Sequence, residues 1–207
     1  MIFAFLRAEV DSELFGPAVL HYARLRGWDR SLIDRGDPWN VRQNRARRGI
    51  LGDVRGYGRN ALLFTNFPEN VSWYRTTLSV ERLRRARYAA WPDWVVLTNG
   101  TLVVADGASR VYHPATPAAI RDHVQGIVDA LQRGSSAAEL ILVGKPDLDE
   151  LVVLEGHKRA TAYVIAFENQ DEPDVILGIS ARIEEWAGWS EEAFARAIGL
   201  DASSGPI

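Results

Sequence analysis

The sequence Leu151-Val-Val-Leu-Glu-Gly-His-Lys-Arg-Ala-Thr-Ala-Tyr-Val-Ile-Ala166 changes its hydrophobic pattern at one glycine. Four apolar residues in a row, 151–154, are typical of a buried strand. After Gly156 the apolar residues recur at helical spacing, with Ala160 and Tyr163 on one face. We therefore predict a strand, a tight turn and a helix in this order.

The polar residues of the turn suit an anion. The first N–H groups of a helix are unpaired and lie at the positive end of its dipole. Gly156 lets the backbone approach a ligand closely, since it has no Cβ. Arg159 would offer two parallel hydrogen bonds to a phosphate, and Lys158 a mobile positive charge. Glu155 would be a base or a metal ligand beside that anion; the alternative is a polar surface corner without a ligand.

The same residues carry a resemblance. Gly156-His157-Lys158-Arg159, followed by Ala-Thr-Ala, resembles the Gly-x-x-Arg turn of the ParB/sulfiredoxin superfamily, in a version similar to a poorly characterised bacterial branch. The superfamily resemblance covers mainly residues 138–168. The branch resemblance covers most of the chain and includes three further segments: Arg55-Gly56-Tyr57, Phe67-Pro68 with Trp73, and Leu97-Thr98-Asn99-Gly100-Thr101.

The resemblance implies a nucleotide-binding protein, because this turn holds nucleotide phosphates in the superfamily. The implied activity is that of an ATP- or other NTP-dependent phosphotransferase, such as a small-molecule kinase, or of an NTPase, with Mg²⁺ as a second cofactor. Glu155 and His157 would be catalytic, and Glu155 would also be the Mg²⁺ contact. The phosphates would be bound by Gly156, His157, Lys158, Arg159 and Thr161. In sulfiredoxin a reactive cysteine occupies the position of His157, and this chain has no cysteine, so that repair reaction is excluded.

Further ligand-binding candidates lie outside the turn. Arg55 and Tyr57 flank a glycine and form either a structural turn or a loop that meets the phosphates. Trp73 and Arg75 would stack on a base, or they are a core aromatic residue and a surface charge. The resemblance adds Thr98 and Asn99 as substrate-pocket candidates. Relatives carry Gly-Thr-Arg near here where this chain has Gly-Thr-Leu, which does not favour identical chemistry.

The remaining pattern predicts the other elements. We expect helices near 12–26, 79–90, 117–134 and from 190 onward, and strands near 61–64, 73–75, 139–144 and 174–180. Ser79 and Ser190 would cap the second and the last of these helices, and a turn over 145–150 would bring the strand that starts at 151 back beside the strand at 139–144. Asn99-Gly100 lies between two apolar runs, 94–97 and 101–105, and therefore predicts a hairpin. In the first helix we expect a buried face formed by Leu14, Ala18, Tyr22 and Leu25. In the arginine-rich segment that follows, we expect Arg45 and Arg47 on a solvated helix face; the alternative is an electropositive flap near an anionic ligand.

Composition excludes several classes of protein. The absence of cysteine excludes disulfides and cysteine-ligated zinc, and four scattered histidines do not predict a zinc site. No apolar run reaches the length of a membrane span, so we expect a cytoplasmic protein without a membrane partner. The net charge of −3 makes nucleic acid an unlikely partner, since nucleic-acid binders usually carry a basic surface.

These observations predict an α/β (α+β) fold: a small mixed β-sheet with surrounding helices, resembling the ParB/sulfiredoxin fold, with extra N-terminal helices. We expect a single domain over residues 1–200, a helical arginine-rich part over 1–60, the signature strand-turn-helix within 138–168, and a flexible tail over 201–207. The alternative function is a non-catalytic protein that binds a nucleotide or phosphometabolite, or a scaffold. A ParB-like nuclease or DNA-associated factor is the weakest alternative, and the oligomeric state stays open.

Overall fold

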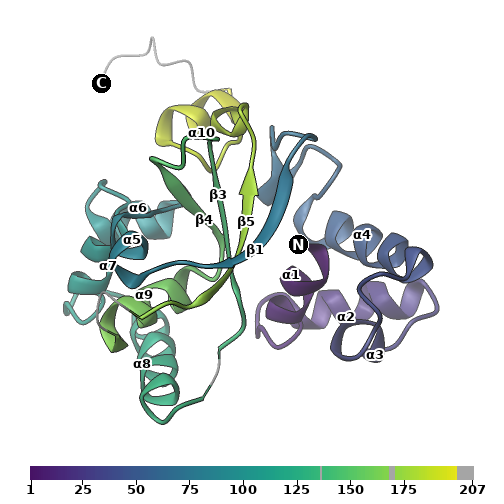
Figure 1. Cartoon of the computed structure of the whole chain (residues 1–207), viewed down its shortest axis with the longest axis horizontal. Coiled ribbons are helices and arrows are strands. Elements are labelled where there is room, and N and C mark those ends of the chain that lie inside the picture. The colour runs from purple at the N-terminus through teal and green to yellow at the C-terminus, as the bar shows by residue number, and fades with distance from the viewer. Residues whose placement is uncertain (136, 168–170, 200–207) are drawn as a thin grey trace. The chain divides into compact units, whose positions relative to one another are not determined.

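The computed structural model describes residues 1–135, 137–167 and 171–199 (Figure 1). Its chain divides into two compact units, Met1–Glu69 and Asn70–Ile207. The sequence led us to expect one domain with a helical part that ends near residue 60. The helical part forms a compact unit that extends to Glu69, and the single domain stays a prediction. The tail expected at 201–207 lies outside the described residues.

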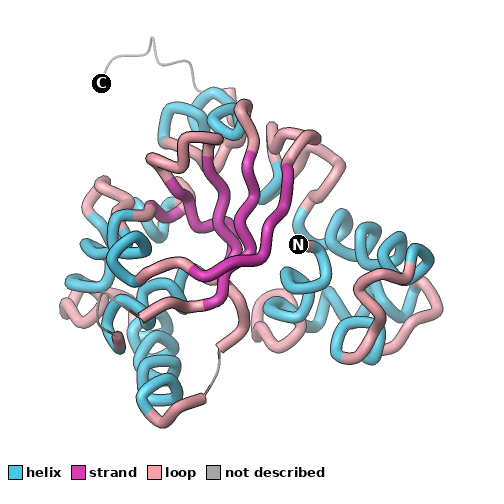
Figure 2. The backbone as a smooth tube through the Cα atoms, in the orientation of Figure 1, coloured by secondary structure: helices cyan, strands magenta, loops and turns pink. Residues whose placement is uncertain are grey.

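The second unit contains a five-stranded mixed sheet, which confirms the predicted α+β fold (Figure 2). The order of the strands is β1-β5-β3-β4-β2, and their bounds are β1 Ser72–Thr77, β2 Arg87–Tyr88, β3 Leu140–Gly144, β4 Leu151–Glu155 and β5 Asp174–Ile179. Strands β3 and β4 form an antiparallel hairpin, as predicted, and β3 is parallel to β5. The edge strand β1 is antiparallel to β5.

The register of the strands decides which residues meet at one end of the sheet. Ile141 at the start of β3 is opposite Glu155 at the end of β4, and it is also opposite Ile176 of β5. Arg75 of β1 is in turn opposite Ile176. The last residue of β4, the segment before β3 and the middle of β1 therefore lie at the same end of the sheet.

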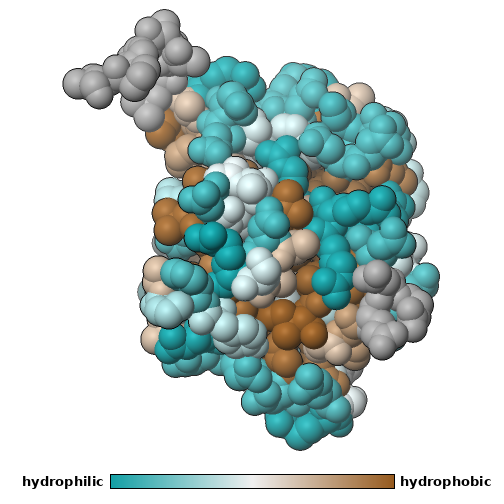
Figure 3. Space-filling view, turned by 90° about the vertical axis from the view of Figure 1, so that its left-hand side faces the viewer, coloured by the Kyte–Doolittle hydropathy of each residue, from teal (hydrophilic) through white to brown (hydrophobic). Residues whose placement is uncertain are grey.

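Five helices pack with the sheet around one hydrophobic core: α5 Val80–Arg85, α6 Pro92–Thr98, α7 Val104–Arg110, α8 Ala118–Gln132 and α9 His157–Ala166. In β3 and β4, Leu142 and Val153 belong to this core, and their neighbours Val143 and Val152 are also fully buried. Both faces of these strands are covered, so their sequences are continuously apolar rather than alternating. From the side of α5–α8, the surface is largely hydrophilic with separate apolar areas (Figure 3).

The hairpin predicted for residues 94–105 is wrong, because this segment forms the helices α6 and α7. Pro92 occupies the first turn of α6, where its missing N–H costs nothing. Asn99 ends α6 in the left-handed conformation, with φ 55°, and Gly100 follows with φ 88°. The positive φ values that suit Asn-Gly to a hairpin turn also suit it to the end of a helix.

Two further boundaries differ from the prediction. Ser79 caps α5 through a hydrogen bond from the Arg82 N–H, as expected, but the helix ends at Arg85 instead of continuing to residue 90, and residues 87–88 form β2. Residues 62–64 form a 3₁₀ helix instead of a strand. The helical unit contains no strand in the described chain, so a strand there would have no partner for its hydrogen bonds. At the other end of the chain, Ser190 caps α10 Glu191–Ala197 as predicted.

The first unit consists of four α-helices and this 3₁₀ helix: α1 Ile2–Glu9, α2 Gly16–Leu25, α3 Ser31–Asp34 and α4 Val41–Arg55. The prediction of which residues form the buried face of α2 is wrong. Leu14 and Leu25 are exposed, whereas Val19 and Ala23 form the buried side. Helix α4 packs against both α1 and α2.

Arg47 of α4 is fully buried, so its predicted place on a solvated face is wrong, whereas Arg45 is exposed as expected. The guanidinium of Arg47 donates hydrogen bonds to the carbonyls of Leu32 and Asp37, at 2.7–3.0 Å. It also donates to two side-chain oxygens of its own helix, Asn44 Oδ1 and Gln43 Oε1. Burial lowers the pKa of Arg47, and these acceptors stabilise the charged group inside the unit.

Candidate functional site

The turn between β4 and α9, residues 155–159, has the geometry that the sequence predicts; we name it the α9 turn. Gly156 is in the left-handed region, with φ 95° and ψ 30°, and precedes the first residue of α9. Its carbonyl accepts the first hydrogen bond of the helix from the Ala160 N–H, at 2.8 Å. A Cβ at this position would lie 2.8 Å from both Arg159 Nη2 and Leu140 Cδ2. Glycine is therefore required both by the backbone conformation and by the side chain that packs against it.

That side chain, Arg159, folds back over the turn. Its Nη2 lies 3.3 Å from Glu155 Oε1 and 3.5 Å from the Glu139 carbonyl oxygen. The two side chains of this ion pair are only 15% (Arg159) and 17% (Glu155) exposed. Arg159 Nε is buried and has no hydrogen-bond partner among the described residues. The turn thus holds a largely buried cation with one unsatisfied donor, which is costly unless an acceptor satisfies it.

The register brings Arg75 to the same end of the sheet. Its Nε lies 2.5 Å from Glu139 Oε1, and the backbone carbonyl of Glu139 faces Arg159. Trp73, two residues earlier on β1, packs its ring directly on Gly178 of β5, where a Cβ would lie 2.6 Å from the ring. Arg75 is therefore joined to the α9 turn through Glu139, whereas Trp73 packs on the sheet.

A pocket of about 510 Å³ opens beside Arg159, and we name it the α8 pocket. It is lined by one side of α8 and the segment that follows: His123, Gly126, Ile127, Ala130, Leu131, Ser135, Ala137, Ala138 and Arg159. Most of its wall is apolar, and its polar groups are Arg159, His123 and Ser135. Lys158 of the α9 turn lies beside it, with Nζ 3.3 Å from His123 Nδ1. The pocket therefore combines an apolar wall with cationic groups.

His157 is half-buried and packs against the core, and Thr161 lies inside it. The ring of His157 stacks on Trp94, with centroids 5.0 Å apart and planes at 12°, and its Nε2 accepts a 3.4 Å hydrogen bond from the Ala89 N–H. Thr161 is fully buried; its hydroxyl shares a 2.6 Å hydrogen bond with Tyr88 and donates to the His157 carbonyl at 2.9 Å. This removes Thr161 from the phosphate-binding candidates. The His157 ring is an aromatic packing group that does not line the α8 pocket.

Thr98 and Asn99 are structural residues of α6 rather than pocket residues. The Thr98 hydroxyl donates to the Trp94 carbonyl at 2.7 Å and accepts from the Leu102 N–H at 2.9 Å. Asn99 provides the left-handed residue that ends the helix. Neither residue lines the α8 pocket.

Arg55 and Tyr57 belong to the helical unit, and contacts within that unit account for them. Arg55 Nε lies 3.3 Å from the buried carboxylate of Glu9, and its guanidinium lies 4.0 Å from the centre of the Phe15 ring. Tyr57 packs edge-on against Phe64, with centroids 4.9 Å apart, and burial raises the pKa of its phenol. Gly56 between them has φ 84°. The segment has the features of a structural turn, which was one of the two alternatives.

Two contributors to the site were missed in the sequence. His123 lies on α8 and was not among the predicted site residues. Glu139 stood at the start of a predicted strand with no sign of a partner. Both reach Lys158 or Arg159 only through tertiary packing, so no local pattern indicated them.

The described residues contain no group of three or more His, Asp or Glu side chains that could hold a metal ion. Likewise, no helix in the described part of the chain is long and apolar enough to cross a membrane. Comparisons of the chain with protein-family models, with curated proteins and with solved structures found no match. The candidate site therefore rests on its own geometry.

Proposed function

We propose that the second unit binds a phosphorylated small molecule, most simply a nucleotide, with the phosphates at the α9 turn and the remainder in the α8 pocket. The observation that carries this proposal is the unsatisfied Nε of Arg159. This donor is buried on a cation that lines a pocket and lies over the N-terminal turn of a ten-residue helix. An anionic oxygen there would satisfy the donor, oppose the charge and meet the positive end of the helix dipole.

The shape and lining of the α8 pocket support a ligand with both a charged and an apolar part. Its volume of about 510 Å³ falls within the range of small-molecule sites. Ile127, Ala130 and Leu131 offer an apolar wall along α8, on which a flat base would lie. Lys158 and His123 add positive charge or hydrogen-bond donors at the same rim. The α9 turn resembles the Gly-x-x-Arg turn of ParB/sulfiredoxin-like proteins, which holds nucleotide phosphates. This resemblance supports the placement of the phosphates at the α9 turn.

The proposal extends to phosphoryl transfer from ATP or another NTP, as in a small-molecule kinase or an NTPase. Glu155 is the carboxylate of the α9 turn, and its ion pair with Arg159 occupies it in this structure. If a phosphate draws Arg159 toward itself, Glu155 is released to accept the proton of an attacking hydroxyl. As the alternative to this role as a base, Glu155 would hold a Mg²⁺ ion together with the phosphates of the nucleotide, since Mg²⁺ commonly uses one or two carboxylates together with substrate phosphates.

The test of binding is a thermal-shift and calorimetric panel of ATP, ADP, CTP, GTP and AMP, each with and without Mg²⁺. A ligand at about a hundred times its Kd stabilises the protein by ~2.7 kcal/mol, on the order of 5–10 °C for a unit of this size. We expect a nucleotide-specific shift in the wild type that is lost in Arg159→Ala and in the pocket-filling variant Ala130→Phe. The matched control is Arg182→Ala, which removes an exposed arginine from another Arg–Glu ion pair of the same unit. No shift with any nucleotide would overturn the proposal.

Glu155→Gln separates the catalytic form of the proposal from the non-catalytic alternative, a nucleotide or phosphometabolite sensor. In the catalytic form, this variant keeps most of the binding and loses turnover by about 10²–10⁴-fold, the usual contribution of a general base. In the non-catalytic form, nucleotide is bound but no phosphate is released or transferred by the wild type. Phosphate release and transfer to hydroxyl acceptors are the measurements.

A further inference from the structure

The two units carry opposite net charges. Residues 1–69 contain eleven arginines and eight carboxylates, whereas residues 70–207 contain thirteen basic and nineteen acidic residues. The net charge of −3 for the whole chain therefore combines +3 in the helical unit with −6 in the other. The acidic net charge thus belongs to residues 70–207, and the helical unit carries the excess of basic residues that nucleic-acid binders usually have.

We propose that the helical unit binds a single-stranded nucleic acid through the exposed side of α4. The buried side of this helix is formed by Arg47, Ile50, Leu51 and Val54. Arg42, Arg45 and Arg48 are exposed and follow one another at intervals of three residues, so at 100° per residue they lie on the side opposite the buried one. We name these three residues, with the exposed Trp39, the α4 face.

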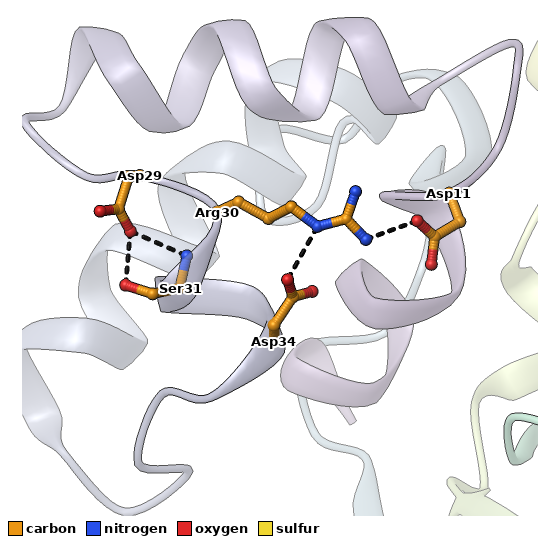
Figure 4. A network of polar contacts seen from close by, with 5 residues as sticks. All are labelled: Asp11, Asp29, Arg30, Ser31 and Asp34. Atoms are coloured by element: carbon orange, nitrogen blue, oxygen red, sulfur yellow. Dashed lines mark hydrogen bonds and ion pairs between the residues drawn. The ribbon is translucent and has the colours of Figure 1, made fainter.

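Among the described residues, the ion pairs of the helical unit involve other arginines than those of the α4 face. Arg30 binds both Asp34, at 2.7 Å, and Asp11, at 2.5 Å (Figure 4). Asp53 is shared by Arg26 and Arg59, and Glu9 pairs with Arg55. Among the described residues, no carboxylate lies within ion-pair distance of the three arginines of the α4 face. Their charge is therefore available to an external anion.

Two of these arginines lie over aromatic rings. The guanidinium of Arg42 lies 5.6 Å from the centre of the Trp28 ring, and that of Arg48 lies 5.7 Å from the Tyr57 ring. Trp39, just before α4, is 88% exposed. Surfaces that bind single strands combine positive charge for the phosphates with aromatic rings on which bases stack. Trp39 would provide the stacking group and the three arginines the phosphate contacts.

The surface continues along the second half of α4 because two glycines of the helix make room for it. A Cβ at Gly49 would lie 2.8 Å from Arg26 Nε, and one at Gly52 would lie 3.0 Å from Arg59 Nε. Arg26 and Arg59 thus lie directly over the helix, with Asp53 as their one shared carboxylate. The excess of positive charge extends over the length of α4, as the backbone of an extended strand requires.

The test is fluorescence anisotropy with labelled single-stranded DNA and RNA of about 20 nucleotides, titrated with the full chain at salt concentrations from about 50 to 200 mM. The main variant is Arg42→Gln/Arg45→Gln/Arg48→Gln. Its matched control, Arg82→Gln/Arg85→Gln/Arg182→Gln, removes the same charge from exposed arginines of the other unit. Trp39→Ala tests the stacking group. Because the Trp39 side chain is exposed, we expect this substitution to leave the fold unchanged.

We expect the main variant to bind at least tenfold more weakly, with a slope of log Kobs against log salt that is shallower by about 2, since each phosphate contact on a single strand contributes ~0.7. Trp39→Ala should bind at least fivefold more weakly with an unchanged slope, because stacking releases no counterions. The control should bind like the wild type. The proposal is overturned if the wild type does not bind at the lowest salt, if the control is weakened as much as the main variant, or if vesicles containing phosphatidylserine are bound and oligonucleotides are not.

Discussion

At the scale of single residues, Gly156 and Arg159 depend on each other. Arg159 can fold back over the turn because residue 156 has no Cβ, and the left-handed φ of 95° excludes most other residues. We expect Gly156→Ala to destabilise the protein by about 2–3 kcal/mol, from the left-handed conformation and the displaced guanidinium together. It should also abolish the nucleotide-dependent thermal shift, because Arg159 would be moved.

The matched control is Gly126→Ala, in α8 beside the same pocket. An added Cβ there meets nothing within 4 Å. In a helix interior this exchange is expected to stabilise by roughly 0.8–1 kcal/mol. Urea unfolding of both variants measures the two effects, and equal stabilities would contradict the account of Gly156.

We expect the free energy of unfolding to depend on pH through Tyr88. Burial raises the pKa of its phenol, so the folded protein keeps this proton at alkaline pH values where the unfolded chain, with a phenol pKa of about 10, has lost it. The stabilisation from Tyr88 is therefore complete below pH ~10 and is lost as the pH rises above that value.

Tyr88→Phe tests this sign. At neutral pH the variant should be less stable by about 1 kcal/mol, because the hydrogen bond with Thr161 is lost. The difference between wild type and variant should shrink above pH ~10 and then reverse, since only the wild type must keep or lose this proton. Denaturant unfolding from pH 7 to 11 is the measurement; a constant difference over this range would refute the assignment.

At the scale of elements, the end of α6 depends on a residue in the left-handed conformation. Asn99 is left-handed at the end of the helix, so Asn99→Ala should cost about 1–2 kcal/mol, whereas Asn99→Gly should leave the stability within about 0.5 kcal/mol of the wild type. Far-ultraviolet circular dichroism with thermal unfolding compares the variants. A larger loss in Asn99→Gly than in Asn99→Ala would contradict the left-handed cap.

At the scale of the whole molecule, the two proposed sites lie in different units. The α9 turn, Glu139 and the α8 pocket all belong to residues 70–207, and the α4 face belongs to residues 1–69. We expect a fragment of residues 70–207 to show the circular dichroism of a folded α+β protein and the same nucleotide-dependent shift as the full chain. We expect it not to bind single-stranded oligonucleotides. A folded fragment that has lost the nucleotide shift would show that the first unit is needed for the site.

The sequence alone determined those elements whose signals are local. The run 151–154, the glycine after it and the helical spacing beyond it predicted β4, the α9 turn and α9. Ser79 and Ser190 were identified as caps because their hydroxyls bond to an N–H only three residues ahead. The predicted strands β3 and β5 were recognisable because a strand covered on both faces is apolar at almost every position.

Tertiary structure decided everything that depended on a partner distant in sequence. Asn99-Gly100 suits a hairpin and a helix end equally, and only the packing of α6 in the core selected the helix. Arg45 and Arg47 lie in the same arginine-rich segment, whose sequence does not show which of them is buried. Arg47 is buried because the Leu32 and Asp37 carbonyls lie where its guanidinium can donate hydrogen bonds to them. The sequence predicted only the part of the site that belongs to the α9 turn. The strand register and the packing of α8 bring Glu139 and His123 to Arg159 and Lys158. The spacing of apolar residues predicts which side of a helix or strand is buried. It does not predict which charged group from a distant part of the chain will contact that element.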